Sequence, residues 1–188
     1  LYNRGFRMMS LQHFFDNKLG GSLHGTSGEG LTQFGRDAVA EMLALGIMLD
    51  VSHSSEQVVA DTLALSDKPL IVSHTGFQGH CDSPRNISDA LMEQIAAAGG
   101  LIAVGFWDGA ICGNSPATVA AAIVYGIGLV GEDHVALGSD FDGTVTTSFD
   151  GSEMVVITQA LLEANLSEQQ IRKVMGENML GYLQTYLP

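Results

Sequence analysis

Short, continuous apolar runs alternate along this chain with longer amphipathic segments. Five runs have the length of strands, and they cover residues 6–11, 47–51, 70–72, 101–106 and 134–138. Their side chains are apolar without a period of two, which is typical of strands that are buried on both faces. The pattern therefore predicts parallel strands that are covered by helices.

Helices are predicted between and after these strands. The first has the apolar residues Phe34, Ala38 and Met42 at helical spacing, with Thr32 as its N-cap and Gly46 just past its end. Further helices are expected to begin near Ser55, Ser88, Ser115, Ser152 and Ser167. The result is about five β-α units in series, and no linker divides residues 1–188 into separate domains.

Two architectures fit a series of β-α units: an open doubly wound sheet, or part of a (β/α)8 barrel. No glycine-rich phosphate-binding motif follows any of the strands, which disfavours nucleotide binding. The chain has 188 residues, fewer than the ~250 of a typical complete barrel. A barrel would therefore be only partly covered by this chain.

Composition and charge narrow the range of partners. Eight Lys and Arg against 21 Asp and Glu give a formal net charge of −13. A chain this acidic repels phosphate groups, and we therefore expect neither nucleic acid nor an acidic membrane surface as a partner. Cations are the ligands that its charge favours. No apolar run reaches the ~18 residues of a membrane span. No basic segment followed by an apolar stretch opens the chain, which predicts a cytoplasmic location.

Cysteine usage gives little further information. Cys81 and Cys112 are the two cysteines, and they form neither a CxxC pair nor a framework of bridges. A disulfide scaffold is therefore excluded, and the redox compartment stays open.

A phrase that is repeated at two strand ends carries the clearest chemical signal. The letters VSHS place His53 at one strand end, and VSHT places His74 at the next, 21 residues later. Adjacent parallel strands lie about 4.8 Å apart, so two imidazoles at the same edge can converge on a metal ion such as zinc. The alternative is a pair of loop histidines that hydrogen-bond to carbonyl groups at the strand ends.

Three further side chains, those of Asp140, Arg85 and His13, are expected at this edge. Asp140 directly follows the fifth strand, where a carboxylate can bind a metal or accept a proton from metal-bound water. Asp142 precedes a glycine, which is typical of a turn. Arg85 lies in the loop after His74, where a guanidinium can hold a substrate carboxylate, or else form a surface salt bridge. His13 follows the first strand.

The remaining histidines carry weaker signals. His134 precedes its strand and so belongs at the opposite end of the strands, where residues serve stability. His80 has only Cys81 beside it, and His24 lies in a glycine-containing loop. The loop at residues 144–151 is a candidate lid.

Taken together, these motifs resemble the renal (membrane) dipeptidase family. DVSH at 50–53, VSH at 72–74, PRN at 84–86 and GSDFDG at 138–143 occur in the order of that family. The opening at residues 5–13 and the pair EN at 177–178 are also similar, so the resemblance covers essentially the whole chain. It implies a (β/α)8 TIM-barrel metallopeptidase that binds two zinc ions and hydrolyses dipeptides.

The resemblance also implies a role for each candidate residue. His53 and His74 match the two histidine ligands of one zinc. Asp140 matches the catalytic aspartate beside the metal-bound water, which passes a proton to the leaving amine. Arg85 matches the group that binds the dipeptide's carboxylate, and His13 matches the histidine that faces the oxygen of the scissile carbonyl.

One part of the family pattern has no counterpart in this chain. The His-x-Asp pair from the family's first strand and the bridging glutamate from its third strand are absent, so the chain resembles strands four to eight only. We expect a missing N-terminal half of the barrel as a partner, a homo-oligomer being a further possibility, and no dipeptidase activity from the chain alone.

Three other functions remain open at this point. One is a different metal-dependent amidohydrolase on the same barrel, although Arg85 favours a substrate with a free carboxylate. The others are a non-enzymatic member of the family, and a metal-binding regulatory or storage module.

Overall fold

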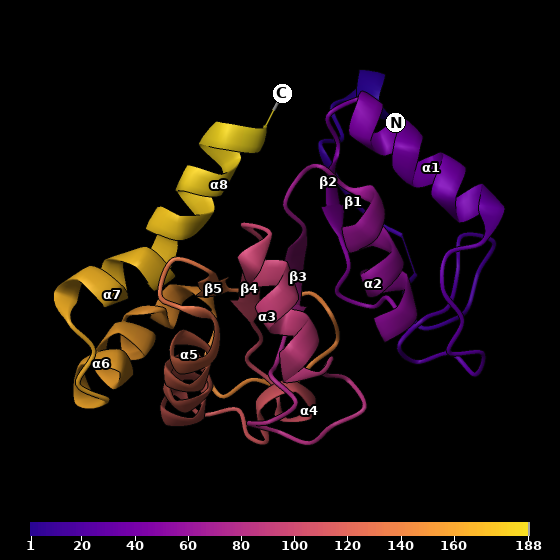
Figure 1. The fold of residues 1–188 in the computed structure, drawn as a ribbon. Helices are drawn as coiled ribbons and strands as arrows, with labels where there is room; N and C mark the ends of the chain where they lie inside the picture. Colours follow the sequence, from indigo (N-terminus) through magenta and orange to yellow (C-terminus); the bar gives the residue numbers. More distant parts are fainter. Residues whose placement is uncertain (188) are drawn as a thin grey trace.

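Five short strands form one parallel sheet in the computed structural model, which describes residues 1–187 (Figure 1). The strands are β1 (Met8–Ser10), β2 (Met48–Asp50), β3 (Ile71–Thr75), β4 (Leu101–Val104) and β5 (Val135–Leu137). They pair in chain order, β1-β2-β3-β4-β5, and every pairing is parallel. A doubly wound sheet reverses its strand order at a switch point, whereas a barrel wall does not. The sheet therefore matches the wall of a (β/α)8 barrel.

Helices follow each strand, as the sequence predicts. They are α1 (Gln33–Ala44), α2 (Glu56–Leu65), α3 (Asp89–Ala97), α4 (Asp108–Ile111), α5 (Pro116–Val130), α6 (Val155–Glu163), α7 (Glu168–Arg172) and α8 (Asn178–Tyr186). Short 3-10 turns occupy Tyr2–Arg4 and Gly151–Glu153, and a π-helical turn at Lys173–Glu177 separates α7 from α8. The short helix α4 and this π-helical turn were not predicted.

Most of the predicted helix starts are capped by the expected side chains. The hydroxyl of Thr32 accepts a hydrogen bond from Gly35 N, and Ser55 and Ser115 cap α2 and α5 in the same way. Two predicted starts differ. Ser152 lies within the 3-10 turn Gly151–Glu153, which Asp150 caps, and α6 begins only at Val155. At the start of α3, Ser88 makes no capping bond with its side chain. Its backbone N–H instead donates to the carboxylate of Glu56, 2.6 Å away, which ties the start of α3 to α2.

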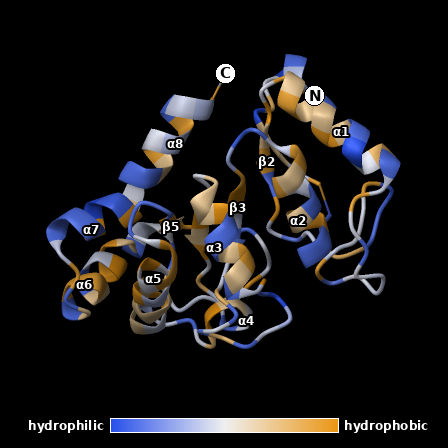
Figure 2. Cartoon of the chain, viewed as in Figure 1, coloured by the Kyte–Doolittle hydropathy of each residue, from blue (hydrophilic) through white to orange (hydrophobic). Residues whose placement is uncertain are grey.

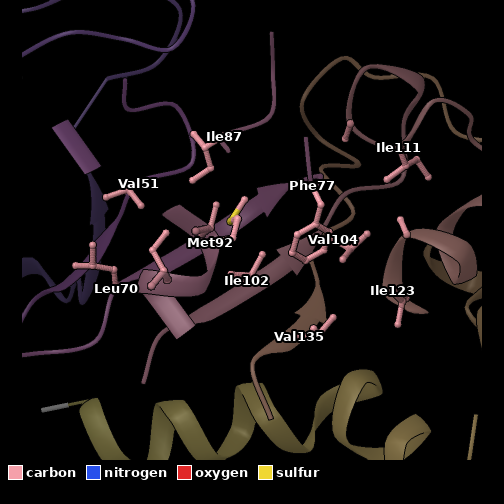
Figure 3. Close-up of a cluster of buried hydrophobic side chains, with 14 of the residues drawn as sticks. Val51, Leu70, Phe77, Ile87, Met92, Ile102, Val104, Ile111, Ile123 and Val135 are labelled. Atoms are coloured by element: carbon pink, nitrogen blue, oxygen red, sulfur yellow. The ribbon is translucent and has the colours of Figure 1, made fainter. Parts of the chain in front are cut away.

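The two faces of the sheet bury different sets of residues. In β4, Ile102 and Val104 belong to the large cluster that packs against the outer helices, and Figure 3 shows these side chains among their neighbours. The alternate residues Leu101 and Ala103 belong to a smaller cluster that also contains Tyr182 of α8. Burial on both faces is the physical reason for the continuous apolar runs in the sequence.

The strand β1 forms one edge of the sheet. Met8 is 40% exposed and the preceding Phe6 is 51% exposed, whereas β2 is buried throughout. In Figure 2 the orange of apolar residues is seen in β3, whose first residues Ile71 and Val72 are buried. An exposed apolar edge is the surface against which further strands pair in a closed barrel.

A disulfide joins Cys81 to Cys112, which the sequence did not predict. The bridge links the loop after β3 to the end of α4, across 31 residues of chain. One bridge does not make a disulfide scaffold, but it does constrain the loop that carries Arg85. The expected cytoplasmic location stays a prediction.

One helical stretch is longer and more apolar than the sequence analysis recognised. Asp108–Val130 meets the length and composition of a membrane-spanning helix, as some core helices of soluble proteins also do. It consists of the separate helices α4 and α5, and Val119 and Ile123 of α5 are fully buried in the core. Packing against the sheet therefore accounts for the apolar residues on the buried face of α5.

Candidate metal centre at the carboxyl ends of the strands

The two histidines proposed as metal ligands converge in the structure. His53 lies just after β2, and His74 lies within the neighbouring β3. Their Nε2 atoms face each other at 2.9 Å. Adjacent parallel strands thus bring together the two copies of the VSH phrase, as their spacing predicted.

Both imidazoles lie in surroundings that favour the neutral form. Burial, followed by the nearby positive charge of Arg85, lowers the pKa of His53 from 6.5 to about 3. The same two causes, in the same order, lower the pKa of His74. A neutral imidazole has a free lone pair on one nitrogen, which is the form that binds metals.

The geometry of this pair fits two nitrogen ligands of one zinc ion. Two nitrogens at Zn–N bonds of about 2.0–2.1 Å in a tetrahedral arrangement lie about 3.3 Å apart, so the observed 2.9 Å needs only a small opening. Within residues 1–187, no group of three or more His, Cys, Asp or Glu side chains is placed to hold an ion. Catalytic zinc sites use three protein ligands, so the described residues contain a candidate pair of nitrogen ligands rather than a complete site.

A buried carboxylate lies next to the histidines. Asp50, the last residue of β2, is 7% exposed and accepts hydrogen bonds from the hydroxyl groups of Ser52 and Ser73, both at 2.6 Å. Ser73 in turn lies 2.9 Å from the Nδ1 atom of His74. From the sequence, Asp50 was recognised only as part of the DVSH motif, because a single acidic residue in an apolar run does not indicate its hydrogen-bond partners.

An open pocket of about 850 Å³ lies beside the histidines. Its lining includes His13, Asp50, His53, His74, Asp140 and Asp142. His13 and Asp140 thus line the same pocket as the two histidines. The catalytic roles of these residues stay predictions.

Asp140 occupies an unusual backbone conformation. Its φ is +58°, in the left-handed region that is uncommon for residues other than glycine. The glycines of the GSDFDG motif have a packing reason, because a Cβ atom on Gly138 would overlap the carbonyl of Ser73, and one on Gly143 would overlap the Asp140 carboxylate. Burial lowers the pKa of both His74 and Arg85, and the negative charge of Asp140 partly opposes that lowering in each.

Arg85 is buried rather than part of a surface salt bridge. It is 7% exposed, and its Nη2 donates to the backbone carbonyl of His74 at 2.7 Å. Its guanidinium carbon lies 5.5 Å from the centre of the Trp107 ring. Burial lowers the pKa of Arg85 to about 10 despite the opposing effect of Asp140, so the side chain remains charged at pH 7. The buried Nη1 has no hydrogen-bond partner among the described residues.

The neighbouring Asn86 fixes the loop that carries Arg85. Its side-chain oxygen accepts from Gly76 N at 2.9 Å, and its amide donates to the carbonyls of Cys81 and Ala110. Three bonds from one buried amide, together with the disulfide, hold this loop against α4. The PRN motif thus contains one charged group and one residue that holds the loop in place.

Two further rings pack against His53. The centroid of the His13 ring lies 4.6 Å from that of His53, and the His24 ring lies 5.4 Å away. The Nε2 atom of His24 is buried and has no partner among the described residues. The sequence gave His24 a weak signal, because only the folding of its loop onto β2 brings it here.

The other histidines lie away from the pocket, as the sequence indicated. His134 precedes β5, and its Nδ1 lies 2.9 Å from the carbonyl oxygen of Gly100. His80 packs against the ring of Tyr125 on α5, with 5.6 Å between centroids. Residue Thr144, the first of the loop proposed as a lid, lines the pocket, but its motion stays a prediction.

Fold and site together resemble part of a barrel hydrolase of the metal-dependent type. The family described as "Membrane dipeptidase (Peptidase family M19)" matches residues 1–185. The chain therefore belongs to the membrane dipeptidase family, as the motifs had indicated.

Curated relatives agree with this family. The chain is 32% identical over 193 residues to an uncharacterised dipeptidase of Schizosaccharomyces pombe, with 95% of this chain and 46% of the relative covered. It is also 32% identical over 196 residues to dipeptidase verJ of Clonostachys rogersoniana, with 98% of this chain and 50% of the relative covered. The chain thus spans about half the length of these relatives.

Solved structures share the fold. A metallopeptidase from Rhodobacter sphaeroides, liganded with a phosphinate mimic of the dipeptide L-Ala-D-Ala, is 29% identical with a TM-score of 0.86, and the match covers 98% of this chain and 57% of that one. The probable dipeptidase PvdM of Pseudomonas aeruginosa has a TM-score of 0.87 at 23% identity, covers 96% of this chain and 62% of that one, and supports the fold alone. These structures are TIM-barrel-type dipeptidases, and this chain corresponds to part of their barrel.

Proposed function

We propose that this chain forms the C-terminal part of a zinc-dependent dipeptidase. The observation that carries the proposal is the distance of 2.9 Å between the Nε2 atoms of two neutral, largely buried histidines. The family match over residues 1–185 supports peptide-bond hydrolysis, and a relative's structure with a dipeptide mimic supports the size of the substrate.

The candidate residues divide the work between metal binding and substrate binding. His53 and His74 would hold zinc, and the remaining ligands would come from the N-terminal part of the barrel. Zinc in such a site polarises the peptide carbonyl and lowers the pKa of a bound water. His13 lines the pocket next to His53, where it can donate a hydrogen bond to the oxygen of the scissile carbonyl as negative charge develops there.

Asp140 and Arg85 would complete the reaction. The carboxylate of Asp140 lines the pocket, where it can accept a proton from the attacking water and pass it to the leaving amine. The unpartnered Nη1 of the buried Arg85 can pair with the terminal carboxylate of a dipeptide. A fixed positive group near the reacting carbonyl favours dipeptides over longer chains, because it fixes the distance between the two.

The test is an assay of the protein with a complete barrel, in which the N-terminal strands are present. A panel of dipeptides should be cleaved in the presence of zinc, and a chelator should abolish the cleavage. Cleavage of the same dipeptides with an amidated C-terminus should be far slower. No cleavage of any dipeptide by a folded, zinc-loaded protein would refute the proposal in favour of a non-enzymatic member or a metal-binding module.

A further inference from the structure

Asp50 lies next to the proposed metal ligands without a role in the proposed reaction. Its carboxylate accepts four hydrogen bonds, which come from the backbone N–H and the hydroxyl group of each of Ser52 and Ser73. Four donors, from just beyond the end of β2 and from β3, must converge on one buried carboxylate. A fully hydrogen-bonded buried network of this kind is rigid.

The hydrogens of this network can be counted. Each serine hydroxyl carries one hydrogen, and each hydroxyl oxygen lies 2.6 Å from a carboxylate oxygen, the short distance of a bond to a charged acceptor. Asp50 therefore takes the hydrogen of Ser73. The hydroxyl oxygens of Ser52 and Ser73 also lie 2.9 Å apart, but the shorter contacts of 2.6 Å to the carboxylate use the hydrogen of each. The oxygen of Ser73 can then only accept from the Nδ1 atom of His74, 2.9 Å away.

This count determines the tautomer of His74. If Ser73 accepts at Nδ1, that nitrogen carries the ring hydrogen, and the Nε2 atom has a free lone pair. The Nε2 atom is the one that faces His53. The lone pair is thus directed to the place where a metal would bind, before any metal is present.

We propose that Asp50 is a positioning residue that acts through Ser73 to hold His74 in the tautomer that can bind a metal. Partners of this kind orient metal-binding histidines in general, and their loss costs about 10–100-fold in metal affinity. The benefit of this tautomer for metal binding rests on the proposed function. The tautomer itself is a property of the metal-free protein and can be tested separately.

His53 lacks an equivalent partner. Its Nδ1 atom is buried without a hydrogen-bond partner among the described residues. In the metal-free arrangement, the lone pair on His74 Nε2 accepts the Nε2 hydrogen of His53, so His53 must move its hydrogen to Nδ1 before it can bind a metal. His74 is therefore the preorganised member of the pair, and His53 is the member that adapts.

The variant Asp50→Asn tests this assignment. The backbone N–H groups of Ser52 and Ser73 both point at the oxygen Oδ1 of Asp50, so the NH₂ group of an asparagine would take the other position, next to the hydroxyl of Ser73. The amide would then donate to that hydroxyl, and the hydroxyl would donate to Nδ1 of His74. The expected result is a change of His74 to the tautomer with hydrogen on Nε2.

The measurement is ¹⁵N NMR of the histidine ring nitrogens in the metal-free protein with a complete barrel, together with zinc titration against a competing chelator. Wild type should show hydrogen on Nδ1 of His74, and Asp50→Asn should show it on Nε2 with zinc affinity about 10–100-fold lower. The control is Ser52→Ala, which removes a hydroxyl that contacts the carboxylate, the Ser73 hydroxyl and the backbone N–H of His74, but leaves the bonds from Ser73 to Asp50 and to Nδ1 of His74 in place. It should keep the wild-type tautomer.

Further variants keep the outcome decisive. If Asp50→Asn does not fold, Ser73→Ala removes the acceptor for Nδ1 and should likewise lose the single tautomer and the zinc affinity. An unchanged tautomer in the folded variants, or hydrogen on Nε2 of His74 in wild type, would overturn the assignment. If the tautomers behave as expected but His74→Ala keeps full zinc affinity, the positioning of His74 stands and its proposed metal role fails.

Discussion

Arg85 donates a hydrogen bond from its Nη2 atom to the backbone carbonyl of His74 at 2.7 Å. The proposed anchor for the substrate is therefore fixed directly to a proposed metal ligand. Its other terminal nitrogen, Nη1, is buried without a partner among the described residues. A buried donor on a charged group is costly to leave unpaired. Arg85 is not among the residues that line the pocket, so its pairing with a substrate carboxylate stays a proposal.

Replacement of Arg85 should act on substrate binding more than on the metal. Arg85→Ala should raise KM for a dipeptide by roughly 10- to 150-fold, the equivalent of the about 1.5–3 kcal/mol of a hydrogen bond to a charged group. Zinc content should stay unchanged, as measured by elemental analysis. Arg85→Lys keeps the charge but not the forked donor, so its KM should lie between those of wild type and Arg85→Ala.

The amidated dipeptide serves as the matched substrate for this variant. The KM of wild type for the amide should rise about as much as the KM of Arg85→Ala rises for the free acid. For Arg85→Ala, the change from free acid to amide should raise KM little further. Equal cleavage of the amide and the free acid by wild type would rule out the carboxylate role of Arg85.

Asp140 should behave as a proton carrier. The variant Asp140→Asn keeps the size and shape of the side chain but cannot accept a proton, so kcat should fall by roughly 10²–10⁴-fold. KM and zinc content should change little. Zinc loss in parallel with activity would instead make Asp140 a metal ligand, and a normal kcat would leave it as a turn residue.

The disulfide should stabilise the fold. Replacement of both cysteines, Cys81→Ala with Cys112→Ala, opens a loop of 31 residues. By the chain-entropy account, the free energy of unfolding should fall by about 3–4 kcal/mol, which denaturant unfolding can measure. Because the bridge fixes the loop of Arg85, KM should also rise. Unchanged stability in the double variant would contradict this account, and an unchanged KM would show that the three bonds of Asn86 suffice to hold the loop.

The metal-free protein should lose stability in mild acid because of His53. The pKa of its imidazole is about 3 in the folded state and 6.5 in the unfolded state, through burial first and Arg85 second. Between these values the unfolded chain binds more protons, so the free energy of unfolding rises with pH. This stability is fully present above pH 6.5 and is lost as pH falls toward 3. Denaturant unfolding should show the slope, and the slope should be smaller in His53→Gln.

The strands and most helices could be predicted from the sequence, because burial on both faces leaves a continuous apolar run. The convergence of His53 and His74 could be predicted too, since one phrase recurs at the ends of adjacent parallel strands. The choice between an open sheet and a barrel wall required the strand order.

Other features depend on contacts that the sequence does not encode locally. Asp50 reaches Ser73 only through the pairing of two strands, and Cys81 meets Cys112 across 31 residues. His24 approaches His53 because an irregular loop folds back over β2. No periodicity marks these contacts, so the network and the disulfide emerged only from the structure.

The central claim is that zinc binds between His53 and His74. The most direct measurement is anomalous X-ray diffraction at the zinc absorption edge, from crystals of the protein with a complete barrel grown with zinc. The account predicts an anomalous peak about 2.0–2.1 Å from the Nε2 atoms of both histidines, and no peak there in His53→Ala or His74→Ala. A fully occupied zinc elsewhere, with this position empty, would contradict the claim.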